Sequence, residues 1–229
     1  MKHKLWVCVC AAILLAASAS ANVFPTAAHA AFNYIPFANG ACTMHQVFDA
    51  NLFANAMPPG YVAKIESIAF APNTNMAGQQ IAQPVQINLG YTNRVGGQAS
   101  PAGLSVPVAG GGGAPNAVGA MTTFFNDPNY SYTVISGGAN NFEMKFVGTP
   151  FIYDPSQGNL LFEIVTPATQ AVFSVSRCAG SAEGSRSYVG GTWTGESPTT
   201  ATRMDIVFTP VPEPTSLLLL GAAVLLRRR

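Results

Sequence analysis

Apolar and polar residues alternate one by one along several stretches of this chain, and a two-residue period is typical of strands buried on one face. In residues 84–92, four large apolar side chains are each followed by a polar residue or a glycine. Residues 141–147 and 203–208 repeat this pattern. The alternation predicts three amphipathic strands, and their inward residues are Val85, Ile87, Leu89, Tyr91, Phe142, Met144, Phe146, Met204, Ile206 and Phe208.

Four further runs are rich in β-branched and aromatic residues, which favour strands. These runs cover residues 65–70, 130–135, 160–165 and 172–178. Segments rich in Pro, Gly, Asn and Asp separate them and are typical of turns. Strands that each have one apolar face bury it by packing as two sheets. The pattern therefore predicts an all-β fold, a two-sheet antiparallel β-sandwich of jelly-roll-like form, over residues 31–210.

One long connection differs from the short turns. Residues 96–119 are rich in Gly, Ala, Pro and Ser and contain few bulky side chains. Such a composition is typical of flexible linkers. We expect this segment to be a flexible connection between two strands.

The first thirty residues have the pattern of a secretory signal peptide. Lys2 and Lys4 precede a thirteen-residue apolar stretch, Leu5 to Ala17, which is within the length range of a signal-peptide apolar region. Two small-x-small cleavage sites follow, one ending at Ala21 and one at Ala30. Cleavage after Ala30 is favoured because Pro25 breaks the chain upstream of it, and cleavage after Ala21 is the alternative. The chain is predicted to be exported.

The last nineteen residues place three features in a fixed order. Pro212, Glu213 and Pro214 come first, an uncharged run from Thr215 to Leu226 follows, and Arg227, Arg228 and Arg229 end the chain. As a helix the run would be about 18 Å long, which is short for a bilayer core of about 30 Å. The arginines favour the cytoplasmic side, so the Pro-Glu-Pro segment is predicted on the outer side.

This tripartite tail closely resembles the PEP-CTERM sorting signal, which bacterial exosortases recognise on exported proteins. A simple tail anchor or a C-terminal core helix would not require Pro-Glu-Pro at this position. The resemblance implies that Pro212, Glu213, Pro214, Arg227, Arg228 and Arg229 form the sorting motif. It also implies an exosortase as processing partner and at least transient contact with the membrane through a short C-terminal helix.

The body of the chain resembles a domain that recurs in exported PEP-CTERM proteins. The resemblance rests on residues 150–164, which include Tyr-Asp-Pro and Gly-Asn-Leu-Leu, and on the preceding residues 45–49 and 65–70. This domain has no established biochemical activity, so the likeness implies a fold and a cellular context and transfers no catalytic residue.

Removing the two terminal signals changes the charge of the chain. The whole sequence has a formal net charge of +1, but residues 31–210 contain six basic and nine acidic side chains, a net charge of −3. No basic patch remains that could bind nucleic acid. Charged residues make up only 9 % of the chain, and a surface solvated by amides and hydroxyls suits an extracellular protein.

Two cysteines remain in the mature chain. Cys8 and Cys10 lie in the signal peptide, and Cys42 and Cys178 lie in the body. In an oxidising compartment two remaining cysteines most simply form a disulfide, so Cys42 and Cys178 are predicted to pair. Two buried free thiols are the alternative, and one histidine with two cysteines does not complete a zinc site.

The mature chain contains few groups for catalysis. His45 is its only histidine if cleavage follows Ala30, and Asp49 would face it only on a helix. A glycosidase would need two carboxylates at a defined separation, for which the candidates are Asp127, Glu143, Asp154 and Glu163. Glu143 and Glu163 alternate with apolar residues as outward strand residues do, and both aspartates precede Pro in turns. We expect no catalytic residue.

Two sets of residues could bind a ligand, although each also fits a structural role. Oxygens of Asp154 and Asn159 could bind calcium, but Asp-Pro followed by Gly is also the composition of a tight turn. Tyr188 and Trp193 lie in a Gly-rich stretch and could form an aromatic platform for sugars, although Trp residues are more often packed in a core. No cofactor and no metal are predicted.

These patterns together predict a non-enzymatic, exported protein that ends at the cell surface or in the extracellular matrix. Its expected role is structural or adhesive within a polysaccharide-rich envelope. A carbohydrate-binding module is the second hypothesis, and a polysaccharide hydrolase that uses paired carboxylates is the third.

Overall fold

The computed structural model describes residues 19–37, 40–167, 173–190 and 193–213. These residues are mostly strand with few helices, and every strand pair is antiparallel. The prediction of an all-β chain with antiparallel sheets is therefore confirmed. The signal-peptide apolar stretch and the tail from Pro214 onward lie outside the described residues.

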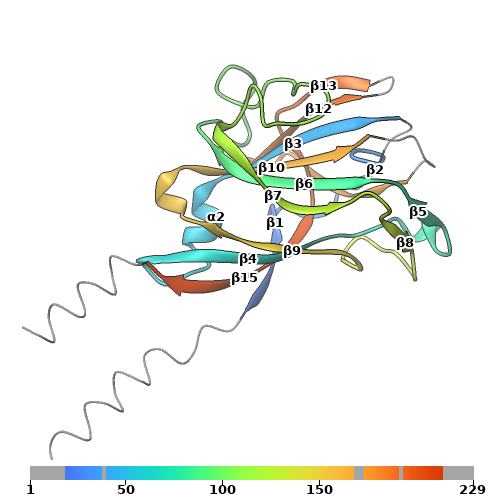
Figure 1. Ribbon diagram of the computed structural model, residues 1–229, viewed down its shortest axis with the longest axis horizontal. Helices are drawn as coiled ribbons and strands as arrows, with labels where there is room; N and C mark the ends of the chain where they lie inside the picture. Colours follow the sequence, from blue (N-terminus) through green and yellow to red (C-terminus); the bar gives the residue numbers. More distant parts are fainter. Residues whose placement is uncertain (1–18, 38–39, 168–172, 191–192, 214–229) are drawn as a thin grey trace, which may run out of the picture.

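Two larger sheets form the body (Figure 1). In order across the sheet, the four-stranded sheet contains β1 (Ser20–Phe24), β15 (Met204–Pro212), β4 (Tyr61–Phe70) and β9 (Met144–Tyr153). The six-stranded sheet contains β13 (Trp193–Ser197), β12 (Gly184–Gly190), β3 (Cys42–Phe48), β10 (Asn159–Thr166), β6 (Val85–Thr92) and β7 (Val118–Asp127).

Two smaller sheets and three short helices complete the described fold. One small sheet contains β14 (Thr200–Thr202), β11 (Val175–Ala179) and β2 (Ala31–Asn33), and the other contains β5 (Gln80–Ala82) and β8 (Ser131–Thr133). The helices are α2 (Ala50–Ala54) and the 3-10 turns η1 (Thr74–Met76) and η2 (Pro155–Gln157). β8 and β11 lie at the runs 130–135 and 172–178 that were predicted to be strands. β2, β5 and β14 were not predicted, because a strand of three residues shows no clear alternation.

The hydrophobic core contains side chains from both larger sheets. Phe70 of β4 and Phe162 of β10 have ring centroids 6.2 Å apart, and Phe70 also meets Phe146 of β9 edge to face at 5.8 Å. All three rings are fully buried. Burial of each such side chain contributes about 1.5–3 kcal/mol, so this aromatic cluster is a main source of stability.

Strands form at all three segments with the clearest alternation, and one of them begins later than predicted. Met204, Ile206 and Phe208 of β15 are fully buried, while Asp205 and Val207 between them are half-buried. In β6 the residues predicted to point inward join the core, with Tyr91 half-buried at its edge. β9 begins only at Met144, so Phe142 lies before the strand and not within it.

β4 contains a β-bulge that interrupts its alternation. Ile65 pairs with Phe208, whereas Ser67 pairs with Val207, so Glu66 is the extra residue. The bulge lets Ile65 and Ile68 both enter the core although they are three residues apart. The side chain of Glu66 remains on the surface, where it lies 2.9 Å from Nζ of Lys64.

Residues 20–37 are part of the folded body. β1 pairs with β15 from Ser20↔Phe208 to Phe24↔Met204, and the ring of Phe24 is buried with its centroid 4.9 Å from that of Phe53. Further along, Thr26 donates hydrogen bonds from its backbone N–H and its hydroxyl to Glu183. Cleavage after Ala30 would remove β1, whereas cleavage after Ala21 would keep Asn22 to Phe24.

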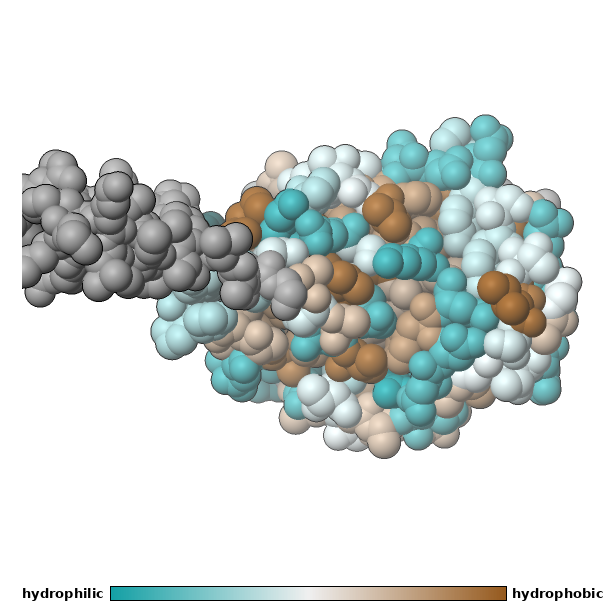
Figure 2. Space-filling model, turned by 90° about the horizontal axis from the view of Figure 1, so that it is seen from below, coloured by the Kyte–Doolittle hydropathy of each residue, from teal (hydrophilic) through white to brown (hydrophobic). Residues whose placement is uncertain are grey.

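The face of the four-stranded sheet that points away from the core is mixed in polarity. Figure 2 shows apolar residues there in small groups between hydrophilic ones. Val147 and Ile152 of β9 are among the exposed apolar side chains. Within the part of the chain that the structure describes, no helix has the length and apolar character needed to cross a membrane.

Candidate functional site

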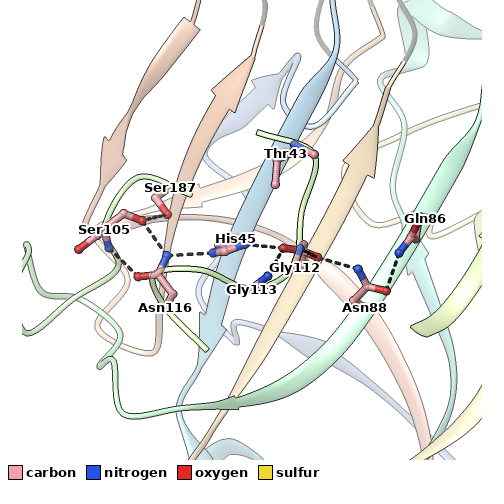
Figure 3. A network of polar contacts seen from close by, with 11 residues as sticks. Thr43, His45, Gln86, Asn88, Ser105, Gly112, Gly113, Asn116 and Ser187 are labelled. Carbon is pink, nitrogen blue, oxygen red and sulfur yellow. Dashed lines mark hydrogen bonds and ion pairs between the residues drawn. The ribbon is translucent and has the colours of Figure 1, made fainter. Parts of the chain in front are cut away.

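A polar row crosses the outer face of the six-stranded sheet. Ser187 of β12, His45 of β3, Glu163 of β10 and Asn88 of β6 lie directly opposite one another in successive strands. Because side chains on directly opposite residues share a face, all four point to the same side of the sheet. The connection from β6 to β7, residues 93–117, lies over this face and meets the row (Figure 3).

Glu163 is the centre of the row and accepts four hydrogen bonds. Its Oε2 lies 2.7 Å from Nε2 of His45 and 2.8 Å from the backbone N of Gly113. Its Oε1 accepts from Nδ2 of Asn88 at 2.6 Å and from the backbone N of Gly112 at 3.1 Å. A carboxylate has about four lone-pair positions, so all the acceptor capacity of Glu163 is used.

His45 is held from both sides. Asn116 accepts from the backbone N–H of Ser105 through Oδ1 at 2.9 Å and donates to the carbonyl of Ser105 through Nδ2 at 2.7 Å. These two bonds fix the orientation of the amide, so Nδ2 also donates to Nδ1 of His45 at 2.9 Å. Nδ1 of His45 is therefore an acceptor, and the ring proton is on Nε2, which donates to Glu163.

The glycine run Gly110 to Gly113 lets the loop approach the carboxylate closely. All four residues have φ between 78° and 98°, the left-handed region that glycine adopts without steric cost. A Cβ on Gly111 would lie 2.7 Å from Cγ2 of Val165 and 3.0 Å from Oε1 of Glu163. Because these residues have no side chains, the N–H groups of Gly112 and Gly113 come within hydrogen-bonding distance of Glu163. Larger residues would prevent this close approach.

The electrostatics of the site favour an ionised Glu163. Burial raises the pKa of Glu163, but the hydrogen bonds from His45, Asn88 and Gly113 outweigh it and bring the pKa to about 2. His45 and Glu163 are both 0 % exposed. Because Nδ1 of His45 is an acceptor, all four donors to this buried anion are uncharged side chains or backbone groups, and its charge is compensated by hydrogen bonds.

The arrangement holds the loop and leaves no group free for chemistry. Both ring nitrogens of His45 and all four acceptor positions of Glu163 are engaged, and neither side chain reaches solvent. A general base must contact the proton that it removes. The network therefore holds the 93–117 loop against the sheet by hydrogen bonds. The expectation that this segment is a flexible connection is wrong.

The other acidic candidates have separate roles in turns. Asp154 caps η2 by accepting from the backbone N–H of Ser156 and from the side chain of Gln157, both at 2.9 Å. Asp127 accepts from the backbone N–H of Asn129, and Glu143 accepts from the N–H groups of residues 135–137. Asp49 accepts from the backbone N–H of Gly96. Its four-residue spacing from His45 does not bring the two side chains together, because residues 42–48 form a strand and not a helix.

The calcium alternative is not favoured by the geometry of its residues. Asn159 donates to the carbonyl of Arg94 and accepts from the backbone N–H of Ala50, whereas the carboxylate of Asp154 accepts from Ser156 and Gln157 of its own turn. Among the residues that the structure describes, no group of three His, Cys, Asp or Glu side chains is placed to hold a metal ion.

Tyr188 and Trp193 lie on neighbouring strands, but only Tyr188 has a described side chain. Tyr188 is half-buried and packs against the core, with the guanidinium carbon of Arg186 5.9 Å from its ring centroid. Trp193 pairs with Gly190 at the end of β12. Gly190 also borders a hollow of about 300 Å³, which is lined mainly by apolar surface and includes Cys42 and Val165.

Cys42 and Cys178 do not form the predicted disulfide and are two buried free thiols. Cys42 begins β3 opposite Thr166 and Gly190, whereas Cys178 lies in β11 opposite Ala201 and directs its thiol to the carbonyl of Ala201 at 3.5 Å. Each is thus fixed in a different sheet with other residues as its neighbours. Burial raises the pKa of the Cys42 thiol to about 12.

The predicted sorting motif begins within the described fold. Pro212 is the last residue of β15, and the backbone N–H of Glu213 donates to the carbonyl of Gly60 at 3.1 Å. Pro214, Arg227, Arg228 and Arg229 lie outside the described residues.

The sequence pattern did not predict that His45 and Glu163 pair. It also did not predict that the other members of the network contact them, namely Asn88, Gly112, Gly113 and Asn116. The expectation that Glu163 is an outward strand residue exposed to solvent is wrong, because its side chain is fully buried. One signal of this was present in residues 160–165, where Glu163 is the only polar residue. A continuous apolar run indicates a strand buried on both faces, and a charge within it requires a partner. The four consecutive glycines were a second signal of close backbone approach.

Comparison with protein-family models, curated proteins and solved structures finds no match to this chain.

Proposed function

We propose that this chain is an exported protein that an exosortase sorts to the cell surface or the extracellular matrix. The observation that carries the proposal is the order of Pro212-Glu213-Pro214, the uncharged run and the three arginines. On this proposal the body lies outside the inner membrane, and the tail is a transient or stable anchor before sorting.

The body is proposed to have a structural or adhesive role and no enzymatic activity. In support of this, the one buried His–carboxylate pair in the described residues uses all its hydrogen-bonding atoms to hold a loop. A jelly-roll-like sandwich of the two larger sheets, with few charged residues and a net charge of −3 over residues 31–210, suits a polysaccharide-rich envelope.

Single substitutions at two prolines test the sorting proposal. Pro212 belongs to the motif, and Pro210 lies two residues earlier on the same strand with similar half-burial. We expect Pro212→Ala to reduce the surface fraction of the protein strongly, as deletion of residues 212–214 would, and Pro210→Ala to leave it unchanged. Cell fractionation measures the outcome. Unchanged localisation after deletion of residues 212–214 would overturn the proposal.

Carbohydrate binding is the second candidate function. It is favoured by the position of Trp193 opposite Gly190, which borders the apolar hollow at the end of the six-stranded sheet. A glycan array with wild-type protein, Trp193→Ala and the control Tyr34→Ala tests it. Tyr34 is a 41 % exposed aromatic residue outside this region. Retention that only Trp193→Ala abolishes would support sugar binding, and no retention by the wild type would exclude it on the array's ligands.

A further inference from the structure

The last strand of the fold runs directly into the Pro-Glu-Pro motif. Val211 and Pro212 pair with Val62 and Tyr61 at the start of β4. The backbone N–H of Glu213 extends this ladder by its hydrogen bond to Gly60. No spacer separates the folded body from the motif, and two of the three motif residues are docked on the body.

The hydrogen-bond pattern between β15 and β4 determines which backbone groups of the motif remain accessible. Hydrogen-bonded and non-hydrogen-bonded pairs alternate along an antiparallel ladder. Because Glu213 donates to Gly60, Glu213 and Val211 turn their N–H and C=O groups toward β4. The backbone nitrogens of Pro210 and Pro212 then point toward the opposite edge of β15. β1 does not cover this part of the edge, because β1 begins at Ser20, which pairs with Phe208. The open edge of the motif therefore has carbonyl groups but no N–H donors.

An enzyme that reads an extended peptide commonly does so by adding it as a strand, through backbone hydrogen bonds. On this protein the edge that carries the N–H groups of Val211 and Glu213 is occupied by β4, and the open edge has prolines at the corresponding positions. Terminal ladder pairs open at low free-energy cost compared with the core. Local opening can therefore expose the motif while the rest of the body stays folded.

We propose that the folded body restrains its own sorting motif, so that the sorting enzyme acts on the motif only after the pairs Pro212–Tyr61 and Val211–Val62 have opened. This inference rests on the proposed function. It assigns a regulatory role to Gly60, Tyr61 and Val62, whose position in the sequence, about 150 residues before the motif, does not suggest one. Sorting then becomes slower as the end of the β15–β4 ladder becomes more stable.

A reversible cross-link tests the proposal. Val62 and Val211 are directly opposite and lie outside the Pro-Glu-Pro motif. Opposite residues in such a pair have Cα atoms about 5.5 Å apart, within the range of a disulfide. We expect the exported double variant Val62→Cys/Val211→Cys to reach the cell surface at least tenfold more slowly than wild type in a pulse-chase experiment. Addition of dithiothreitol should restore the wild-type rate.

The matched control is Ala69→Cys/Asp205→Cys, a directly opposite pair on the same two strands farther from the motif. This cross-link should leave the rate unchanged with and without reductant. A Gly-Ser insertion between Val211 and Pro212 frees the motif and should raise the rate. If wild type is sorted but the Val62–Val211 cross-link has no effect on the rate, the motif is recognised in its docked form and the restraint is refuted. If deletion of residues 212–214 leaves wild-type sorting unchanged, the proposed function itself fails.

Discussion

Glu163 lies directly opposite His45 in the register of β10 and β3, and the two side chains meet at 2.7 Å although 118 residues separate them in the chain. The pair is completed by Asn116 and the Gly110–Gly113 run, which come from the loop between β6 and β7. A buried anion thus fixes the position of a long glycine-rich loop. Its consequences can be measured through stability, pH dependence and substitution of single glycines.

Glu163→Gln should lower the free energy of unfolding by about 3 kcal/mol. The amide group of glutamine would place N–H donors against the donors of His45, Asn88, Gly112 or Gly113, which leaves buried groups unpaired. Urea denaturation of the purified protein measures the loss. Glu66→Gln is the control, because Glu66 forms a surface ion pair with Lys64 and such pairs contribute about 0–1 kcal/mol. Equal losses in both variants would contradict the role of Glu163.

Stability should fall at acidic pH through Glu163. The folded-state pKa is about 2, below the ordinary value of 4.5, so the native fold favours the ionised form. The resulting stabilisation is fully present above the unfolded pKa and is lost as the pH falls from about 4.5 toward about 2. Urea unfolding at several pH values, compared between wild type and Glu163→Gln, isolates this contribution. The same pH slope in both proteins would show that Glu163 does not supply it.

Gly111→Ala should destabilise the protein more than Gly110→Ala. Both glycines have φ near 90°, so both variants suffer the same backbone strain. Only at Gly111 would the new Cβ meet neighbouring atoms, those of Val165 and Glu163. Overpacking of this kind costs about 1–3 kcal/mol. Thermal or urea denaturation gives the difference, and indistinguishable variants would mean that the loop is not pressed against Glu163.

The mature protein should begin at Asn22, because cleavage after Ala21 preserves the pairing of Asn22 to Phe24 with β15. Intact-mass analysis of the exported chain identifies the N-terminus. Phe24→Ala should then lower the free energy of unfolding by about 3–5 kcal/mol through loss of a buried aromatic side chain. Val23→Ala, half-buried on the same strand, should cost much less. A mature chain that begins at Ala31, with no effect of Phe24→Ala, would favour the other cleavage site.

The exported protein should contain two free thiols, Cys42 and Cys178. Both are buried, and the pKa of Cys42 is raised to about 12 by burial, so neither should react with a thiol reagent in the native state. Both should react after denaturation without a reducing agent. Absence of reactive thiols in the denatured, non-reduced protein would show that the predicted disulfide forms after all.

Local pattern was enough to predict much of the fold. The alternation in β6 and β15 identified core residues such as Leu89, Ile206 and Phe208, because burial of one strand face imposes a period of two. The same rule was wrong for the second face of β6, where Asn88 and Thr92 are also buried. That face is covered by the 93–117 loop, and a glycine-rich segment without periodicity does not indicate in the sequence where it will lie.

The candidate site required the register of several strands. Ser187, His45, Glu163 and Asn88 form one row only because β12, β3, β10 and β6 are neighbours with a particular alignment. A shift of one residue would turn any of these side chains to the opposite face. The disulfide prediction was wrong for a similar reason, since cysteine count and compartment do not determine whether two strands bring Cys42 and Cys178 together.

The sequence by itself determined the all-β character of the chain and the order of the residues at its ends, because side-chain alternation and linear motifs are local properties. Only the tertiary structure decided that Glu163 is buried beside His45, that β1 belongs to the body and that Glu213 is hydrogen-bonded to Gly60. Each of these depends on contacts between residues far apart in the chain. Such contacts form only when the whole set of strands has paired, because the entropy of closing long loops is offset by the core that they jointly bury.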